Sequence, residues 1–110
     1  MTLARVALLC PDLLFGSRVE GALRAAGHEV ARYDADGVVE ADALVVDLTG
    51  DGVDVAAVAR AANGVPKIGF YPHVDVDTRR RALEAGYDVV VPRSKMARET
   101  AAVVERVLAA

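Results

Sequence analysis

Two aspartates and one basic segment are the parts of this sequence best suited to carry chemistry. Asp12 follows a short apolar run that ends at Cys10, and Asp47 lies near the end of a second apolar run. Carboxylate oxygens are the ligands that Mg²⁺ prefers, so this pair could hold that ion. A basic residue from segment 93–95 could then balance the charge of a phosphoryl group. The alternative is structural: Asp12 caps a helix, and backbone N–H groups satisfy Asp47.

A second set of polar side chains follows two later apolar runs and comprises Tyr71, His73, Arg93, Ser94 and Lys95. Arg93, Ser94 and the free N–H groups that open the following helix would together attract an anion. His73 is the member of this set that titrates near neutral pH. In the alternative interpretation Asp75 caps a helix and His73 is a solvated loop residue. Arg93 then pairs with Asp47.

The elements that must position these residues alternate along the chain. Runs rich in β-branched residues alternate with stretches of helical period, which is the pattern of βαβ units and a parallel sheet. We expect strands at 4–10, 28–33, 43–48, 67–71 and 88–91, and helices at 15–26, 53–62 and 76–85. Ser94 is expected to cap a last helix whose buried face comprises Ala97, Thr100, Ala101, Val104, Val107 and Leu108. The predicted fold is one doubly wound, three-layer α/β domain over residues 1–110, with a five-stranded, mostly parallel sheet of order 2-1-3-4-5.

The connection between the second and third strands departs from this alternation. Only about nine residues, Asp34 to Asp42, separate the two strands, where a parallel crossover normally needs about a dozen or more. Fully extended, nine residues span roughly 30 Å, enough to return along a short strand without a helix. The sequence therefore predicts a loop or a single turn here, with the crossover helix missing or shortened.

The polar residues of both sets come directly after predicted strands. In an open α/β sheet, ligands bind beyond the carboxyl ends of the strands, near the point where the strand order reverses. We therefore expect the candidate residues to meet at that edge of the sheet.

Composition limits the function classes that are open to the chain. Hydrophobic residues make up 54% of the 110 residues, which excludes a disordered chain, and no unbroken apolar run reaches the roughly 18 residues of a membrane span. The net charge is −3, from 13 basic and 16 acidic residues, so we expect no nucleic-acid partner. The one cysteine, Cys10, cannot form an internal disulfide, and the amino-terminal apolar run is too short for a signal peptide. We expect a cytoplasmic domain without a membrane anchor.

Three short segments occur in an order that is typical of one bacterial family. They are Ala-Gly-His-Glu-Val at 26–30, Leu-Val-Val-Asp-Leu at 44–48 and Ala-Leu-Glu-Ala-Gly-Tyr-Asp at 82–88. Together with the order of the elements, they resemble the receiver domain of response regulators over nearly the whole chain. The resemblance implies a flavodoxin-like fold and a role in two-component signal transduction.

The resemblance also implies roles for individual residues. Receiver domains accept a phosphoryl group on an aspartate at the end of the third strand, here Asp47, and hold Mg²⁺ there with an acidic pair after the first strand. In this chain only one acid, Asp12, remains of that pair. Tyr71 stands where the family has a switch Ser or Thr, and Arg93 is the nearest substitute for the family's Lys, although the two cations are not equivalent. These departures predict an atypical, degenerate receiver with weakened Mg²⁺ binding.

Two functions from different classes follow. The first is signal transduction through contact with a protein partner, a kinase or a downstream effector, with phosphorylation of Asp47 and a homodimer as further hypotheses. The second is binding of a small anionic ligand at the corner where the fourth and fifth strands end. We do not expect an enzyme, because neither histidine is spaced to serve Cys10 or a serine as a base in a recognisable motif.

Overall fold

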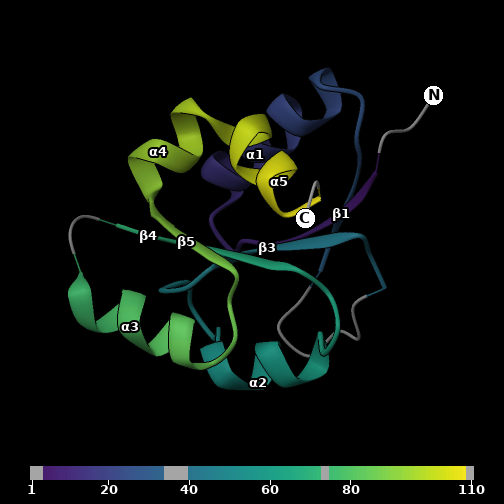
Figure 1. Cartoon of the computed structure of the whole chain (residues 1–110). Coiled ribbons are helices and arrows are strands. Elements are labelled where there is room, and N and C mark those ends of the chain that lie inside the picture. Colours follow the sequence, from purple (N-terminus) through teal and green to yellow (C-terminus); the bar gives the residue numbers. More distant parts are fainter. Residues whose placement is uncertain (1–3, 34–39, 73–74, 109–110) are drawn as a thin grey trace.

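The computed structural model describes residues 4–33, 40–72 and 75–108. Five parallel strands form one sheet in the order β2-β1-β3-β4-β5, and helices cover both of its faces (Figure 1). The predicted three-layer architecture, strand order and parallel direction are therefore confirmed.

Five strands and five helices make up the described part of the chain. The strands are β1 (Arg5–Leu9), β2 (Glu29–Arg32), β3 (Ala43–Asp47), β4 (Lys67–Tyr71) and β5 (Val89–Pro92). The helices are α1 (Leu13–Ala25), α2 (Val55–Ala61), α3 (Val76–Glu84), α4 (Arg93–Arg98) and α5 (Thr100–Leu108). None of these described helices has both the length and the apolar character needed to cross a membrane.

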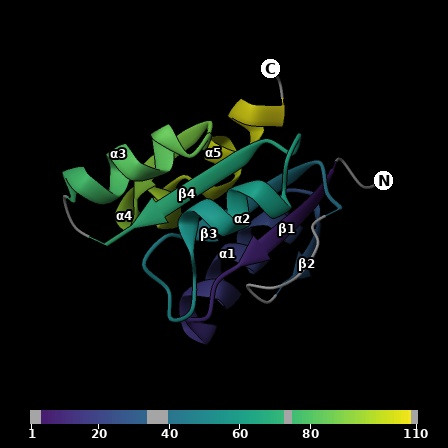
Figure 2. The same ribbon diagram turned by 90° about the horizontal axis from the view of Figure 1, so that it is seen from below.

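Alternating side chains give the sheet two apolar faces. In β1, Val6 and Leu8 pack on the side of α1, α4 and α5, whereas Ala7 and Leu9 pack on the side of α2 and α3. Figure 2 views the molecule from below, the side on which α2 and α3 lie. Because helices bury both faces, the central strands are continuous apolar runs rather than alternating ones.

Aspartates start three of the helices. Asp12, Asp54 and Asp75 are the N-cap residues of α1, α2 and α3, and each carboxylate accepts a hydrogen bond of 3.0–3.1 Å from the backbone N–H three residues later. The cap at Asp12 lets α1 begin at Leu13, two residues before the predicted start at Phe15. The cap at Asp75 confirms the structural alternative for that residue.

The prediction of one continuous helix at the end of the chain is wrong. α4 begins at Arg93 directly after β5, with Pro92 at the N-cap position and no capping hydrogen bond from Ser94. α4 ends at Arg98, and its C-cap residue Glu99 leaves the helical region with a φ of −126° and a ψ of 36°. A second helix, α5, then begins at Thr100.

This interruption changes which side chains are buried. The buried residues of the two helices are Met96, Thr100, Val103, Val104 and Val107, whereas Ala97, Ala101 and Leu108 are only half-buried. The predicted face assumed one helical period throughout, and that period does not continue across Glu99. The Thr100 hydroxyl donates a 2.6 Å hydrogen bond to the Met96 carbonyl, which supplies a partner for a backbone group at the break.

The connection between β2 and β3 is described only at its ends. Residues 34–39 lie outside the described residues, and residues 40–42 contain no helix. Asp42 is tied to the start of β1, since its backbone N–H donates to the Arg5 carbonyl over 2.8 Å. The predicted loop or single turn is therefore consistent with the described part of the connection.

Candidate functional site

Cys10 follows β1 at the carboxyl edge of the sheet. Its side chain is buried, and Sγ lies 3.5 Å from the backbone oxygen of Asp12 and 3.9 Å from Oδ2 of Asp47. Burial raises the pKa of the Cys10 thiol to about 11, and the negative charge of Asp47 adds to this effect. The thiol is therefore protonated at neutral pH and is a poor nucleophile.

Asp47 ends β3 on the same face of the sheet. The residue is only 5% exposed, and among the described residues its carboxylate accepts one backbone hydrogen bond, from the Thr49 N–H to Oδ1 over 3.3 Å. Burial raises the pKa of the Asp47 carboxyl, while the Thr49 hydrogen bond and the charge of Arg93 oppose this shift. Backbone donors thus satisfy Asp47 only in part, and a buried carboxylate with so few partners is costly.

Asp12 uses its two carboxylate oxygens for two different partners. Oδ1 accepts the Phe15 N–H over 3.0 Å, which caps α1, and Oδ2 accepts a 2.5 Å hydrogen bond from Nη2 of Arg93. The Phe15 N–H and then the Arg93 guanidinium lower the pKa of the Asp12 carboxyl. The predicted helix cap is present. The predicted ion pair of Arg93 is instead with Asp12, because α4 begins directly after β5 and carries Arg93 toward the start of α1.

An aromatic pair supports the Arg93 guanidinium. Its central carbon lies 4.2 Å from the centre of the Phe15 ring, within the range of a cation–π contact. The Phe15 ring in turn packs against Phe70 with 5.0 Å between ring centres. Sequence reasoning missed Phe15, since its place in the site depends on α1 and α4 lying side by side.

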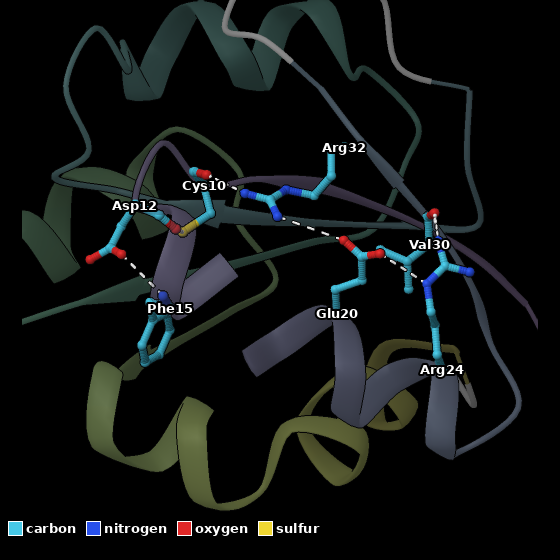
Figure 3. Close-up of polar contacts among 7 residues, drawn as sticks. All are labelled: Cys10, Asp12, Phe15, Glu20, Arg24, Val30 and Arg32. Carbon is cyan, nitrogen blue, oxygen red and sulfur yellow. Dashed lines mark hydrogen bonds and ion pairs between the residues drawn. The ribbon is translucent and has the colours of Figure 1, made fainter. Parts of the chain in front are cut away.

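Arg32 approaches the site from the opposite side, at the end of β2 (Figure 3). Its Nη2 donates a 2.8 Å hydrogen bond to the Cys10 carbonyl, and its Nη1 lies 3.6 Å from Oε1 of Glu20 in α1. A Cβ at Gly16 would overlap the guanidinium, so the glycine makes room for it. Sequence reasoning missed this contact too, although a glycine in the second turn of a helix is a signal of close approach.

The remaining candidates do not join these residues. Tyr71 packs with the side chains on the α2 and α3 side, whereas Phe70 shares the face of Asp47. Within the described residues, the side chains of Ser94 and Lys95 have no hydrogen bond or ion pair. His73 lies outside the described residues.

The receiver resemblance implies Mg²⁺ as the ion of this site, which would need free oxygen ligands. Both oxygens of Asp12 already accept hydrogen bonds, and Oδ1 of Asp47 accepts one as well. Cys10 supplies a protonated sulfur where a hard oxygen ligand is needed. The described ranges contain no group of three or more His, Cys, Asp or Glu side chains placed to hold a metal ion. In this arrangement the residues do not fit Mg²⁺.

Several solved structures have the same fold. NtrX from Brucella abortus matches with a TM-score of 0.84 at 19% identity, over 99% of this chain and 27% of that one. The receiver domain of the Francisella response regulator 1452 gives 0.81 at 14% identity, over 96% and 97% of the two chains. The HemR receiver domain from Leptospira biflexa gives 0.76 at 18% identity, over 96% and 94%. The chain thus spans about a quarter of NtrX and nearly all of each separate receiver domain.

The sequence itself matches no protein-family model and no curated protein. The likeness therefore rests on three-dimensional structure and agrees with the strand order observed here. The chain has the fold of the response-regulator receiver domain, as its short sequence motifs predicted.

Proposed function

We propose that this chain is a pseudo-receiver, a non-catalytic cytoplasmic domain that transmits a signal by binding a protein partner, a kinase or a downstream effector. The receiver fold supports the signalling role. The site supports the distinction from an ordinary receiver, because Arg93 is held on Asp12 and a protonated Cys10 lies beside Asp47.

One observation carries the partner-binding role: two exposed leucines stand beside the site. Leu13 and Leu14 open α1 directly after Asp12 and are 75% and 88% exposed. They lie off the buried face of this helix, which Val19 and Leu23 form. The leucines therefore contribute nothing to the core of the domain, and their burial against a partner would stabilise a complex by about 1.5–3 kcal/mol each.

A binding titration tests this role. The isotope-labelled chain is titrated with purified histidine kinases and response effectors of its source organism, and backbone amide signals are followed by nuclear magnetic resonance. Leu14→Ser should weaken binding by about tenfold or more, since full burial of a leucine is worth at least one decade of affinity. Leu83→Ser is the matched control, because Leu83 is also exposed but lies on α3, on the other side of the sheet. Equal weakening by both variants, or no binding at all, would contradict the proposal.

Phosphorylation of Asp47 separates a pseudo-receiver from an ordinary one. Incubation with a small phosphodonor and Mg²⁺, followed by intact-mass measurement, should show no gain of a phosphoryl group on the wild type. A gain that disappears in Asp47→Ala would identify an ordinary receiver and leave the partner-binding role standing.

The anionic-ligand alternative has no observation in its favour. Its central residue, Arg93, is engaged with Asp12, and α4 has only six residues. Formation of a homodimer stays a prediction.

A further inference from the structure

The charge of Asp12 in the candidate site is already balanced by a cation of the chain itself. Arg93 forms an ion pair with Asp12, and its charge also acts on Asp47. Arg32 lies on the other side of β1, where it donates to the Cys10 carbonyl and its charge faces Glu20 rather than Asp12 or Asp47. Asp12 therefore has little uncompensated negative charge left to attract a divalent cation.

The guanidinium of Arg93 is held in place from two directions. Oδ2 of Asp12 accepts its hydrogen bond, and the Phe15 ring lies beneath its plane. Phe70 supports that ring from the core, and the Arg93 side chain is only 34% exposed. A planar cation that is hydrogen-bonded and stacked in this way is more firmly placed than a lysine ammonium would be.

The Asp12 oxygen that Arg93 occupies is the one a metal ion would need. Oδ1 of Asp12 caps α1, so Oδ2 is the oxygen left for a cation, and Arg93 takes it. Cys10 offers no replacement, because its sulfur is a soft ligand that suits Mg²⁺ poorly and its carbonyl oxygen already accepts a hydrogen bond from Arg32. Arg93 and Mg²⁺ would therefore compete for one carboxylate oxygen.

We propose that Arg93 takes the place of the divalent cation in this receiver-like site by occupying Oδ2 of Asp12, so that the chain holds the Asp12 carboxylate without Mg²⁺. This inference rests on the proposed function for its biological meaning, since it explains how a receiver fold keeps its acidic edge in a fixed arrangement with no metal-dependent phosphoryl transfer. In this arrangement the Asp12–Arg93 pair links α1 to α4.

Calorimetric titration of the full chain with MgCl₂ tests the competition. Arg93→Ala frees Oδ2 of Asp12 and should bind Mg²⁺ at least about tenfold more tightly than the wild type, because the charge of the ligand set controls the affinity of such sites. Arg80→Ala is the matched control: it removes one positive charge from an exposed pair with Asp77 on α3 and should leave the affinity unchanged. Equal affinity of Arg93→Ala and the wild type, including no binding by either, overturns the inference. An equal gain in Arg80→Ala also overturns it.

A measurement on the wild type keeps the test independent of how the variants fold. Backbone amide signals of Asp12 and Asp47 are followed as Mg²⁺ is added, and no saturable shift is expected. A saturable shift at both residues overturns the inference. Arg93→Gln serves as a second variant, and circular dichroism checks that each variant is folded. A wild type that binds Mg²⁺ but still shows the Leu14-dependent partner binding would overturn this inference alone.

Discussion

The two ends of the sheet use aspartate in opposite ways. At the amino end, Asp42 and Asp88 each precede a strand and accept a 2.8 Å hydrogen bond from the first backbone N–H of the neighbouring strand, at Arg5 and Lys67 respectively. The backbone N–H of each aspartate donates back to the same residue over 2.8 Å. At the carboxyl end, Asp47 is buried and, within the described part of the chain, receives one longer backbone hydrogen bond of 3.3 Å.

This difference distinguishes aspartates that stabilise the sheet from an aspartate whose burial lowers the stability of the fold. Asp42 and Asp88 complete the hydrogen bonding of the sheet, so their presence is explained by the fold alone. Asp47 gives up hydration and gains little from the backbone, and burial raises the pKa of its carboxyl. A buried acid whose interactions do not stabilise the fold is a better candidate for a functional role than an acid whose interactions do.

The largest effect on stability is expected at the amino end. Asp88→Ala removes the acceptor of the Lys67 N–H at a buried residue and should lower the free energy of unfolding by about 1–3 kcal/mol. Asp88→Asn keeps an acceptor oxygen and should retain most of the stability. Asp42→Ala should cost less, because its partner Arg5 is exposed. Urea denaturation measures all three, and an undiminished stability of Asp88→Ala would remove the contrast between the two ends.

A smaller effect of opposite sign is expected at Asp47. Asp47→Asn keeps the shape and the Thr49 hydrogen bond but removes the buried charge, so it should raise the urea midpoint at neutral pH. The folded-state pKa of Asp47 lies above the ordinary value of 3.8, so the stability cost of this carboxyl builds up as the pH rises from 3.8 to the folded-state pKa. The gain in stability from Asp47→Asn should therefore be largest above the folded-state pKa of Asp47 and vanish as the pH falls toward 3.8.

The stability of Asp47→Asn at neutral pH also tests whether Asp47 is poorly compensated in the folded state. A destabilising Asp47→Asn at neutral pH would mean that the carboxylate is well compensated in the folded state, as Asp88 is. The two ends of the sheet would then be alike, and the case for Asp47 as a functional residue would lose its energetic support.

How much the sequence could predict differs between the fold and the site. Apolar strands and their order follow from local patterns, and so does the cap at Asp12, which needs only a carboxylate before a helix. The contacts of Phe15 and Arg32 depend on how α1 packs beside α4 and β2. Local sequence patterns do not predict such packing between elements. The interruption between α4 and α5 at Glu99 could not be predicted, because no glycine or proline occurs there.

Tyr71 shows a second limit of prediction. The sequence correctly predicted that Tyr71 lies at the carboxyl edge of the sheet. The face on which its side chain packs depends on the alternation along the strand, and a shift of one residue moves the side chain to the opposite face. Phe70 therefore faces the side of Asp47, and Tyr71 packs on the other side. A family likeness at this position suggested a switch residue, whereas the observed register supplies an aromatic support for Phe15.

The smallest effect is expected from the ion pair that joins α1 to α4. A double-mutant cycle with Asp12→Asn and Arg93→Gln isolates it, because asparagine keeps the helix cap while removing the charge. The coupling should be favourable and should shrink as salt is added, since both side chains are partly exposed, at 43% and 34%. The exposed Arg5–Glu29 pair at the amino end, 53% and 48% exposed, is the comparison and should couple more weakly.

The pH dependence of this pair has the opposite sign to that of Asp47. The Phe15 N–H and Arg93 hold the folded-state pKa of Asp12 below 3.8, so its stabilisation is present above that value and is lost as the pH falls through the folded-state pKa. Asp12→Asn should therefore be less stable than the wild type at neutral pH and equal to it in strong acid. Asp47→Asn is expected to show the reverse, a higher stability than the wild type at neutral pH. Measuring both variants therefore distinguishes Asp12, whose charge is compensated by Arg93, from Asp47, whose burial lowers the stability of the fold.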